Sequence, residues 1–181
     1  MSQDSIPIGE ISFFKSLSAA DLMAVMQYTR VKHYEAEEML FSQEDPPDGL
    51  YVITSGKVRT YFSAPRSTGS VLIRNAVAGD YLGEFGLIDG LPRSASAMAV
   101  EPTEVIYLPA KAFEVLVLTR PSIALGVAQR LAEMVREQTG KAVSIEPLEQ
   151  QLLAGSPLKD LAALKALCGT LRERNLQHLL R

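Results

Sequence analysis

The sequence has only one cysteine, Cys168, in 181 residues. An intramolecular disulfide is therefore impossible, and a cysteine-ligated iron-sulfur cluster or a cysteine-rich zinc site lacks its ligands. Histidine is almost as scarce, because His33 and His178 are the only two and no acidic residue lies near either at metal-ligand spacing. The chain also lacks the Gly-x-Ser-x-Gly motif of serine hydrolases. We therefore expect no metal site, no catalytic residues and no enzymatic activity.

Long hydrophobic runs are missing as well. No window approaches the roughly 20 apolar residues that a transmembrane helix needs, and the N-terminal residues do not lead from a basic region into an apolar segment of signal-peptide length. We therefore expect a cytoplasmic protein that does not contact membranes. The formal net charge is -3, with both signs mixed along the chain. Such a charge provides no field that would attract nucleic acid non-specifically.

The apolar fraction of 47% is ordinary for a globular protein, and 181 residues suit one domain with an appendage. We place a domain at residues 1–140 and a helical tail at 141–181. Ser18 precedes an apolar run and predicts a helix near residues 19–29. Helical patterns return at Ala110 to Leu118, from Pro121 to a point before Gly140, and from Leu158 to Leu180.

The middle of the chain has short segments rich in Val, Ile, Tyr and Phe, separated by Gly, Pro, Asp and Ser. This pattern is typical of a β-sandwich or barrel. In one segment Val58, Thr60 and Phe62 alternate with charged or polar neighbours, which indicates a strand with one buried face. The expected strands are Arg30 to Tyr34, Glu38 to Ser42, Leu50 to Thr54, Lys57 to Phe62, Ser70 to Val77, Ala95 to Val100 and Glu104 to Leu108.

The run from Gly79 to Ser96 carries the chemistry. A turn of helix after Gly83 would expose backbone N–H groups, which attract anions. Arg93 can neutralise the same anion, and its planar guanidinium suits phosphate oxygens. Glu84 is unfavourable beside a phosphate unless it accepts hydrogen bonds, and a sugar hydroxyl is a suitable donor. A phosphate and a sugar together indicate a nucleotide. The simpler alternative is a surface ion pair between Arg93 and Glu84, worth about 0–1 kcal/mol.

The same run resembles the phosphate-binding cassette of the cyclic nucleotide-binding domain family. This family includes catabolite-activator-type regulators, regulatory subunits of protein kinase A and cyclic-nucleotide-gated channels. The resemblance extends from about Ile11 to Gly140 and implies a jelly-roll barrel, or double-stranded β-helix, with flanking helices. The family usually has glycine where this chain has Glu44, in a turn that we expect to lie away from the pocket. Other matching segments are Ile11 to Ser18, Phe41 to Asp45, Asp48 to Ile53, Ser55 to Val58 and Tyr107 to Phe113.

The resemblance implies a role for each residue of the cassette. Glu84 would bind the ribose 2'-hydroxyl, and Arg93 would pair with the cyclic phosphate. Val71 and Ile73 would form the apolar wall against the base. Ser94 supplies a hydroxyl where guanine-selective members tend to have threonine, which favours cAMP over cGMP. The remaining contacts are expected from backbone groups near Gly83, Phe85, Ser94 and Ala95.

These residues predict a sensor that binds a cyclic nucleotide and relays its occupancy to the C-terminal helices by a population shift. The helix from Pro121 to Gly140 has an apolar stripe suited either to the core or to the seam of a homodimer, which we expect it to form. The stripe comprises Ala124, Val127, Ala128, Leu131, Met134 and Val135.

Two alternatives remain open. The first is a DNA-binding regulator of the catabolite-activator type, because residues 160–175 faintly resemble a helix-turn-helix. DNA binding is disfavoured, since the spacing is irregular and residues 141–181 hold only 6 Lys or Arg against 4 Asp or Glu. The second is a ligand-free interaction module with a degenerate pocket. The downstream partner is not defined by the sequence.

Overall fold

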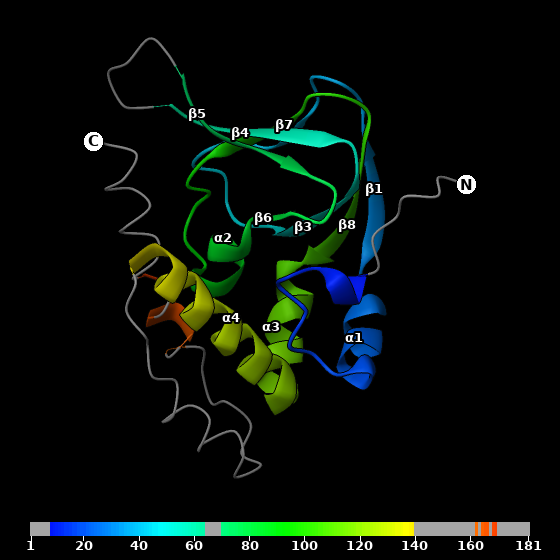
Figure 1. Cartoon of the computed structure of the whole chain (residues 1–181), viewed down its shortest axis with the longest axis vertical. Coiled ribbons are helices and arrows are strands. Elements are labelled where there is room, and N and C mark those ends of the chain that lie inside the picture. The colour runs from blue at the N-terminus through cyan, green and yellow to red at the C-terminus, as the bar shows by residue number, and fades with distance from the viewer. Residues whose placement is uncertain (1–7, 64–69, 140–161, 163, 167, 170–181) are drawn as a thin grey trace.

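The computed structural model describes residues 8–63, 70–139, 162, 164–166, 168 and 169. Its strands form two four-stranded antiparallel sheets, in the orders β1-β8-β3-β6 and β2-β7-β4-β5. The two sheets face each other as a jelly roll, and the larger helices gather at one end of it (Figure 1). The predicted fold class is confirmed. The strands are β1 (Arg30–Tyr34), β2 (Met39–Phe41), β3 (Gly49–Ser55), β4 (Lys57–Ser63), β5 (Ser70–Val77), β6 (Tyr81–Leu82), β7 (Ser96–Ala99) and β8 (Thr103–Pro109).

The predicted strands all form, and β4 has the expected alternation of buried and more exposed side chains. Strand β6 was not predicted, because its two residues are too few to show an alternating pattern. The helices of residues 8–139 are η1 (Ile8–Glu10), α1 (Ala19–Met26), α2 (Glu84–Asp89), α3 (Ala110–Thr119) and α4 (Pro121–Thr139).

Helix α1 begins as predicted. The Ser18 hydroxyl accepts a hydrogen bond from the Asp21 backbone N–H at 3.2 Å, which satisfies one donor of the first turn. The preceding segment, Ile11 to Ser18, forms tight turns, with the Phe14 N–H donating to the Ile11 carbonyl oxygen at 2.9 Å. The turns allow two consecutive residues, Phe13 and Phe14, to be buried against the helices.

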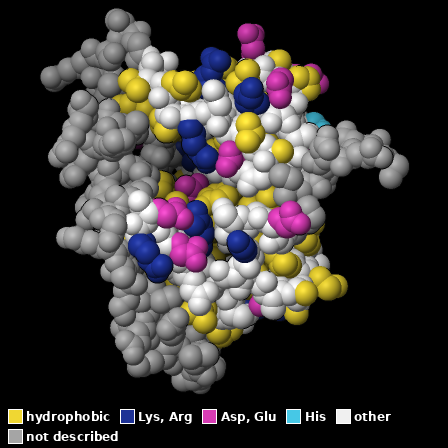
Figure 2. Space-filling view, viewed as in Figure 1, with side chains coloured by type: hydrophobic (Ala, Val, Ile, Leu, Met, Phe, Trp, Pro, Cys, Tyr) yellow, Lys and Arg dark blue, Asp and Glu magenta, His cyan; other side chains and the backbone are white. Residues whose placement is uncertain are grey.

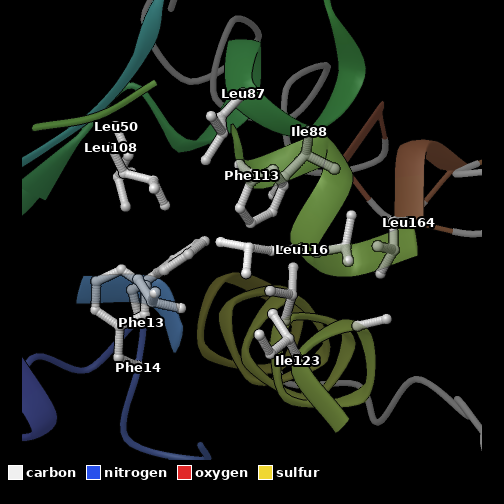
Figure 3. Packing of buried hydrophobic residues seen from close by; sticks show 14 of the residues in the cluster. Phe13, Phe14, Leu50, Leu87, Ile88, Leu108, Phe113, Leu116, Ile123 and Leu164 are labelled. Carbon is white, nitrogen blue, oxygen red and sulfur yellow. The ribbon is translucent and has the colours of Figure 1, made fainter. Parts of the chain in front are cut away.

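Two clusters of buried side chains stabilise the fold. One fills the space between the sheets and includes Tyr51, Ile53 and Val105. The other joins the barrel to the helices and includes Leu50, Ile88 and residues of α3 and α4 (Figure 3). Because α2 contributes to this second cluster, the segment with the candidate site is packed directly against the C-terminal helices.

The apolar stripe of α4 belongs to the core of the chain itself. Ala124, Ala128 and Leu131 are each 0% exposed, so these residues cannot also be a free seam for a second copy. The exposed side chains described on α4 are Ser122, Glu133, Arg136 and Glu137.

Among the described helices, none is individually long and apolar enough to cross a membrane. Helices α3 and α4 meet the criterion of length and composition only as a pair, and they are bent by 110° at their junction.

The structure does not describe most of the tail. Residues 162, 164–166, 168 and 169 are helical, whereas most of the predicted helix from 158 to 180 and of the helix-turn-helix-like stretch lies outside the described residues.

Candidate functional site

Helix α2 begins and ends at glycines in the left-handed region. Gly83 is its N-cap, with φ of 90°, and Gly90 is its C-cap, with φ of 73°. No side chain caps its N-terminus, so the backbone N–H groups of the first turn are oriented outward from the helix end. The turn of helix predicted after Gly83 is therefore present. An Ala at Gly83 would clash with Arg93 Nη1 and lie 2.9 Å from the carbonyl oxygen of Gly49.

Arg93 lies against this N-cap and is 3% exposed. Its Nη1 donates to the Gly83 carbonyl at 3.0 Å, and its Nη2 donates to the Gly49 carbonyl at 2.7 Å and to Asp48 Oδ1. Its guanidinium also lies 4.3 Å from the ring centroid of Phe41, within reach of a cation–π interaction. Nε is buried and has no hydrogen-bond partner within the described part of the chain. The protein thus holds an arginine in place while leaving part of its donor capacity unused.

Asp48 connects Arg93 to the barrel and to α3. Tyr51 Oη donates to its carboxylate at 2.6 Å, while Tyr107 Oη and the Ala110 N–H donate to its backbone oxygen at 2.7 and 2.8 Å. Desolvation raises the pKa of Asp48, but hydrogen bonds from Tyr51 and Arg93, together with the charge of Arg93, outweigh it and lower the pKa overall. Asp48 therefore stays ionised as the partner of Arg93.

The pKa values of Tyr51 and Tyr107 are both affected by the Asp48 carboxylate. Burial raises the pKa of Tyr107 to about 12, with the negative charge of Asp48 adding to the effect. Burial also raises the pKa of Tyr51, which donates to Asp48 directly. Asp48 and these two tyrosines were not predicted to be part of the site. Asp48 follows two prolines in a turn, and Tyr107 is 59 residues away, so only the fold brings the three together.

The expectation that the turn at Glu44 lies away from the pocket is wrong. The Glu44 N–H donates to the Arg93 carbonyl at 2.9 Å, and the Arg93 N–H donates to the Asp45 carbonyl at 2.9 Å. This turn therefore fixes the backbone of Arg93. Glu44 has φ of 68°, in the left-handed region that favours glycine, which gives a physical reason for the glycine that the family usually has there.

Glu84 lies in the first turn of α2, within electrostatic reach of three arginines. Desolvation raises the pKa of its carboxyl, while its own backbone N–H and the charges of Arg74, Arg93 and Arg130 act in the opposite direction without cancelling the shift. The alternative of an ion pair between Arg93 and Glu84 is not observed, since the described salt-bridge partner of Arg93 is Asp48. Glu84 is therefore a half-buried acceptor in a positive environment, suited to a hydroxyl donor.

Arg130 was not predicted from the sequence. It extends from α4, and its Nε donates to Tyr81 Oη at 3.2 Å, next to the start of α2. Its Nη1 lies 3.3 Å from both Glu133 and Glu137 on its own helix. Figure 2 shows basic and acidic side chains interspersed on the face that includes α2 and α4. An arginine beside the apolar stripe of this helix gave no signal of the contact, because its partner lies 49 residues earlier in the sequence.

The predicted apolar wall lies on β5. Strand β5 pairs with β4, so that Val71 lies opposite Phe62 and the fully buried Ala76 lies opposite Val58. Directly paired residues share one face of a sheet. Although Val71 pairs with the buried Phe62, it is 47% exposed, and Ile73, at a shift of register, is 37% exposed. Their role against a base stays a prediction.

Ser94 and Ala95 follow Arg93 and are half-buried, directly before β7. Phe85, in the first turn of α2, is partly buried and packs against the cluster that joins the barrel to the helices. Together with Gly83, Glu84 and Arg93, they form the segment into which the sequence placed the ligand. Within the described residues, no group of three or more His, Cys, Asp or Glu side chains is arranged to hold a metal ion. The arrangement favours binding of a small anion that also carries hydroxyl groups.

The comparisons with known proteins agree with this geometry. The family profile described as "Cyclic nucleotide-binding domain" matches residues 31–120. The "Cyclic AMP receptor protein" of Thermus thermophilus is 32% identical over 127 residues, covering 68% of this chain and 57% of that protein. This chain spans between 8% and 57% of the first curated relatives that it matches.

Solved structures agree in fold. The catabolite activator protein of Thermus thermophilus has a TM-score of 0.62 at 24% identity, covering 91% of this chain and 88% of that one. The regulatory domain of Toxoplasma gondii PKA, crystallised with cAMP, has a TM-score of 0.61 at 21% identity and covers 70% and 47%. Since the profile match, the two facing sheets and the segment around Arg93 coincide, this chain belongs to the cyclic nucleotide-binding domain family through residues 31–120.

Proposed function

We propose that the chain is a non-catalytic, cytoplasmic cAMP sensor that passes the state of its pocket to its C-terminal helices. The observation that carries the proposal is the geometry of Arg93. It is a buried arginine, fixed by Asp48 against the N-cap of α2, and its Nε has no partner within the described residues. A cyclic phosphate can use this donor and the first-turn N–H groups of α2 together.

Glu84 supports a ligand that carries a ribose. Its carboxyl is desolvated, which raises its pKa. A hydroxyl of a bound sugar would donate a hydrogen bond to this carboxyl in place of the water molecules that it has lost. The small hydroxyl residue Ser94 favours adenine over guanine among relatives of this kind. The relative named "Cyclic AMP receptor protein" is consistent with this preference.

Two contacts favour a relay to the C-terminal helices. Arg93 is bonded to Asp48, whose backbone oxygen accepts from the first N–H of α3 at 2.8 Å. On the other side, Arg130 of α4 donates to Tyr81 and adds positive charge near Glu84. Because a ligand that changes the positions of Arg93 and Glu84 alters both contacts, its differential affinity can shift α3 and α4 between two placements.

The proposal is tested by calorimetry of the full chain with cAMP and with cGMP. We expect cAMP to bind more tightly, and Arg93→Ala to weaken binding by about 2–5 kcal/mol because it leaves the phosphate charge unpaired. Arg93→Lys should also weaken binding, because lysine lacks the planar guanidinium. Arg59→Ala is the matched control, since Arg59 is an exposed arginine on β4 of the same barrel.

The results separate the competing functions. If neither nucleotide binds, or if Arg93→Ala binds cAMP as tightly as Arg59→Ala, the pocket is wrongly assigned. A gel-shift assay that detects salt-sensitive binding to DNA would favour a DNA-binding regulator instead. Homodimerisation through residues 121–140 stays a prediction, and because the apolar stripe of α4 is buried within the chain, such a contact has to use another face. Sedimentation of the full chain measures it.

A further inference from the structure

A lysine of β1 lies on the inner face of the barrel. Lys32 is half-buried and lies opposite Val105 of β8, which is 0% exposed in the cluster between the two sheets. Because directly paired residues share one face of a sheet, the Lys32 side chain starts from the face that is turned toward this cluster. Within the described part of the chain, no carboxylate forms a salt bridge with Lys32. Its partners are aromatic rings.

The Lys32 ammonium group packs against two tyrosine rings. Its Nζ lies 3.6 Å from the ring centroid of Tyr107 and 5.2 Å from that of Tyr51. Both distances are within the roughly 6 Å over which a cation is attracted to an aromatic face. Tyr51 and Tyr107 are paired on the neighbouring strands β3 and β8, and their ring centroids are 5.0 Å apart. Lys32 therefore contacts both members of an aromatic pair.

The same aromatic pair leads to the candidate site. The Tyr51 hydroxyl donates to the Asp48 carboxylate at 2.6 Å, and the Tyr107 hydroxyl donates to the Asp48 carbonyl oxygen at 2.7 Å. Asp48 is in turn the salt-bridge partner of Arg93, whose guanidinium lies 5.7 Å from the Tyr51 ring centroid. An unbroken series of contacts therefore runs from Lys32 through the two tyrosines and Asp48 to Arg93.

The place of each tyrosine hydroxyl depends on the tilt of its ring. A cation held against the ring restricts this tilt, and a hydrogen bond weakens steeply when its donor is misaligned. An ion pair with a buried partner, such as Arg93 with Asp48, stabilises the protein only when its geometry is good and its other polar atoms are hydrogen-bonded. The alignment of the two tyrosines therefore bears directly on the alignment of Arg93.

We propose that Lys32 is a positioning residue of the site: it fixes the rings of Tyr51 and Tyr107, which hold Asp48 against Arg93, and so keeps Arg93 oriented for an anionic ligand. That this ligand is a cyclic nucleotide rests on the function proposed above. The contacts from Lys32 to Arg93 do not depend on it.

Calorimetry of the full chain with cAMP tests this role. Lys32→Met keeps the apolar stem and removes the ammonium group, and we expect cAMP to bind about three- to tenfold more weakly, as the loss of one cation–π contact allows. Lys32→Arg restores a cation over the rings and should bind within about twofold of wild type. Lys57→Met is the matched control, because Lys57 is also half-buried but precedes the inward-facing Val58 and so lies on the outer face of its sheet. It should bind cAMP as the wild type does.

A second background separates action through the tyrosines from a direct effect of the lysine charge. Tyr51→Phe and Tyr107→Phe together keep both rings and remove both hydroxyls. In this background we expect Lys32→Met to change cAMP affinity by less than about twofold, because the rings no longer hold Asp48. An undiminished loss of affinity would mean that Lys32 acts by its charge alone, and the positioning role would be refuted.

The pKa of Asp48 is a readout that needs no nucleotide. Desolvation raises this pKa, and the hydrogen bond from Tyr51 is one of the interactions that lower it overall. Lys32→Met should therefore raise the pKa of Asp48 in an NMR titration of its carboxyl carbon, whereas Lys32→Arg and Lys57→Met should leave it unchanged. The rise should be lost when Tyr51 is replaced by phenylalanine.

The results separate this positioning role from the proposed function. If cAMP binds the wild type and Lys32→Met equally, and the pKa of Asp48 is unchanged, the role is refuted and the sensor function stands. If Lys32→Met binds more tightly, Lys32 weakens the site by repelling Arg93, and the role is refuted as well. If no nucleotide binds, the proposed function fails, while a raised pKa of Asp48 in Lys32→Met still supports the role. Circular dichroism verifies that each variant is folded.

Discussion

Replacing Gly83 by alanine tests the geometry of the site at its tightest point. Gly83 has φ of 90°, a conformation that costs a residue with a Cβ about 1–2 kcal/mol. The new Cβ would also clash with Arg93 Nη1 and lie 2.9 Å from Gly49 O. Arg93 therefore has to move away from the N-cap of α2, which removes a hydrogen bond made by a charged group, worth about 1.5–3 kcal/mol.

The matched control is Gly90→Ala at the other end of the same helix. Gly90 also has positive φ, at 73°, but a Cβ there meets no atom within 4 Å. This variant carries the backbone cost of about 1–2 kcal/mol without displacing Arg93. We expect the unfolding free energy to fall by about 1–2 kcal/mol for Gly90→Ala and by about 2–5 kcal/mol for Gly83→Ala in urea titrations.

The affinity for nucleotide should differ more between Gly83→Ala and Gly90→Ala than the unfolding free energy does. If Arg93 supplies a charge-assisted hydrogen bond to the phosphate, its displacement weakens binding about 10- to 150-fold, since every 1.4 kcal/mol is a factor of ten. Calorimetry with cAMP should show this loss for Gly83→Ala and near-normal affinity for Gly90→Ala. Equal affinities in two folded variants would refute the argument that Arg93, seated against Gly83, binds the phosphate.

Three further predictions concern single residues of the site. The pKa of Glu84 is raised above the ordinary value of about 4.3 for a glutamate. As the pH falls through this raised pKa, the carboxylate is protonated, and we expect the affinity for cAMP to decrease. Glu84→Gln should bind weakly without this pH dependence in calorimetry, and because the folded state disfavours the ionised carboxyl, the free variant should be more stable than wild type at neutral pH. The pKa of Asp48 is lowered in the folded state, so its ionised carboxylate stabilises the fold at every pH above its unfolded pKa of about 3.9. This stabilisation is lost as the pH falls through the folded pKa. Asp48→Asn should lower stability at pH 7 and flatten the acid limb of the unfolding profile, and an unchanged acid limb would contradict the assignment. Glu44→Gly, at φ of 68°, should stabilise the turn that fixes Arg93 by about 1 kcal/mol in thermal unfolding, whereas a loss of stability would mean that the Glu44 side chain makes a compensating contact.

Several features of the site required the fold. Asp48 becomes the partner of Arg93 across 45 residues, and Arg130 reaches Tyr81 across 49. Side chains so distant along the chain leave no local pattern, because their contact depends on the register of strands and the packing of α4. The same holds for Cys168, which the sequence presented only as a lone thiol and which the structure buries against α2.

The sequence by itself determined the starts of α1 and α2 and every strand except β6, because alternation in β4 and the caps of these helices are local consequences of side-chain size and backbone conformation. It also determined that Gly83, Glu84 and Arg93 belong to one segment. Tertiary structure alone decided that Arg93 pairs with Asp48 and not with Glu84, and that the stripe of α4 faces the core. These outcomes depend on which surfaces the two sheets and the helices bury against one another, and burial is a property of the assembled chain.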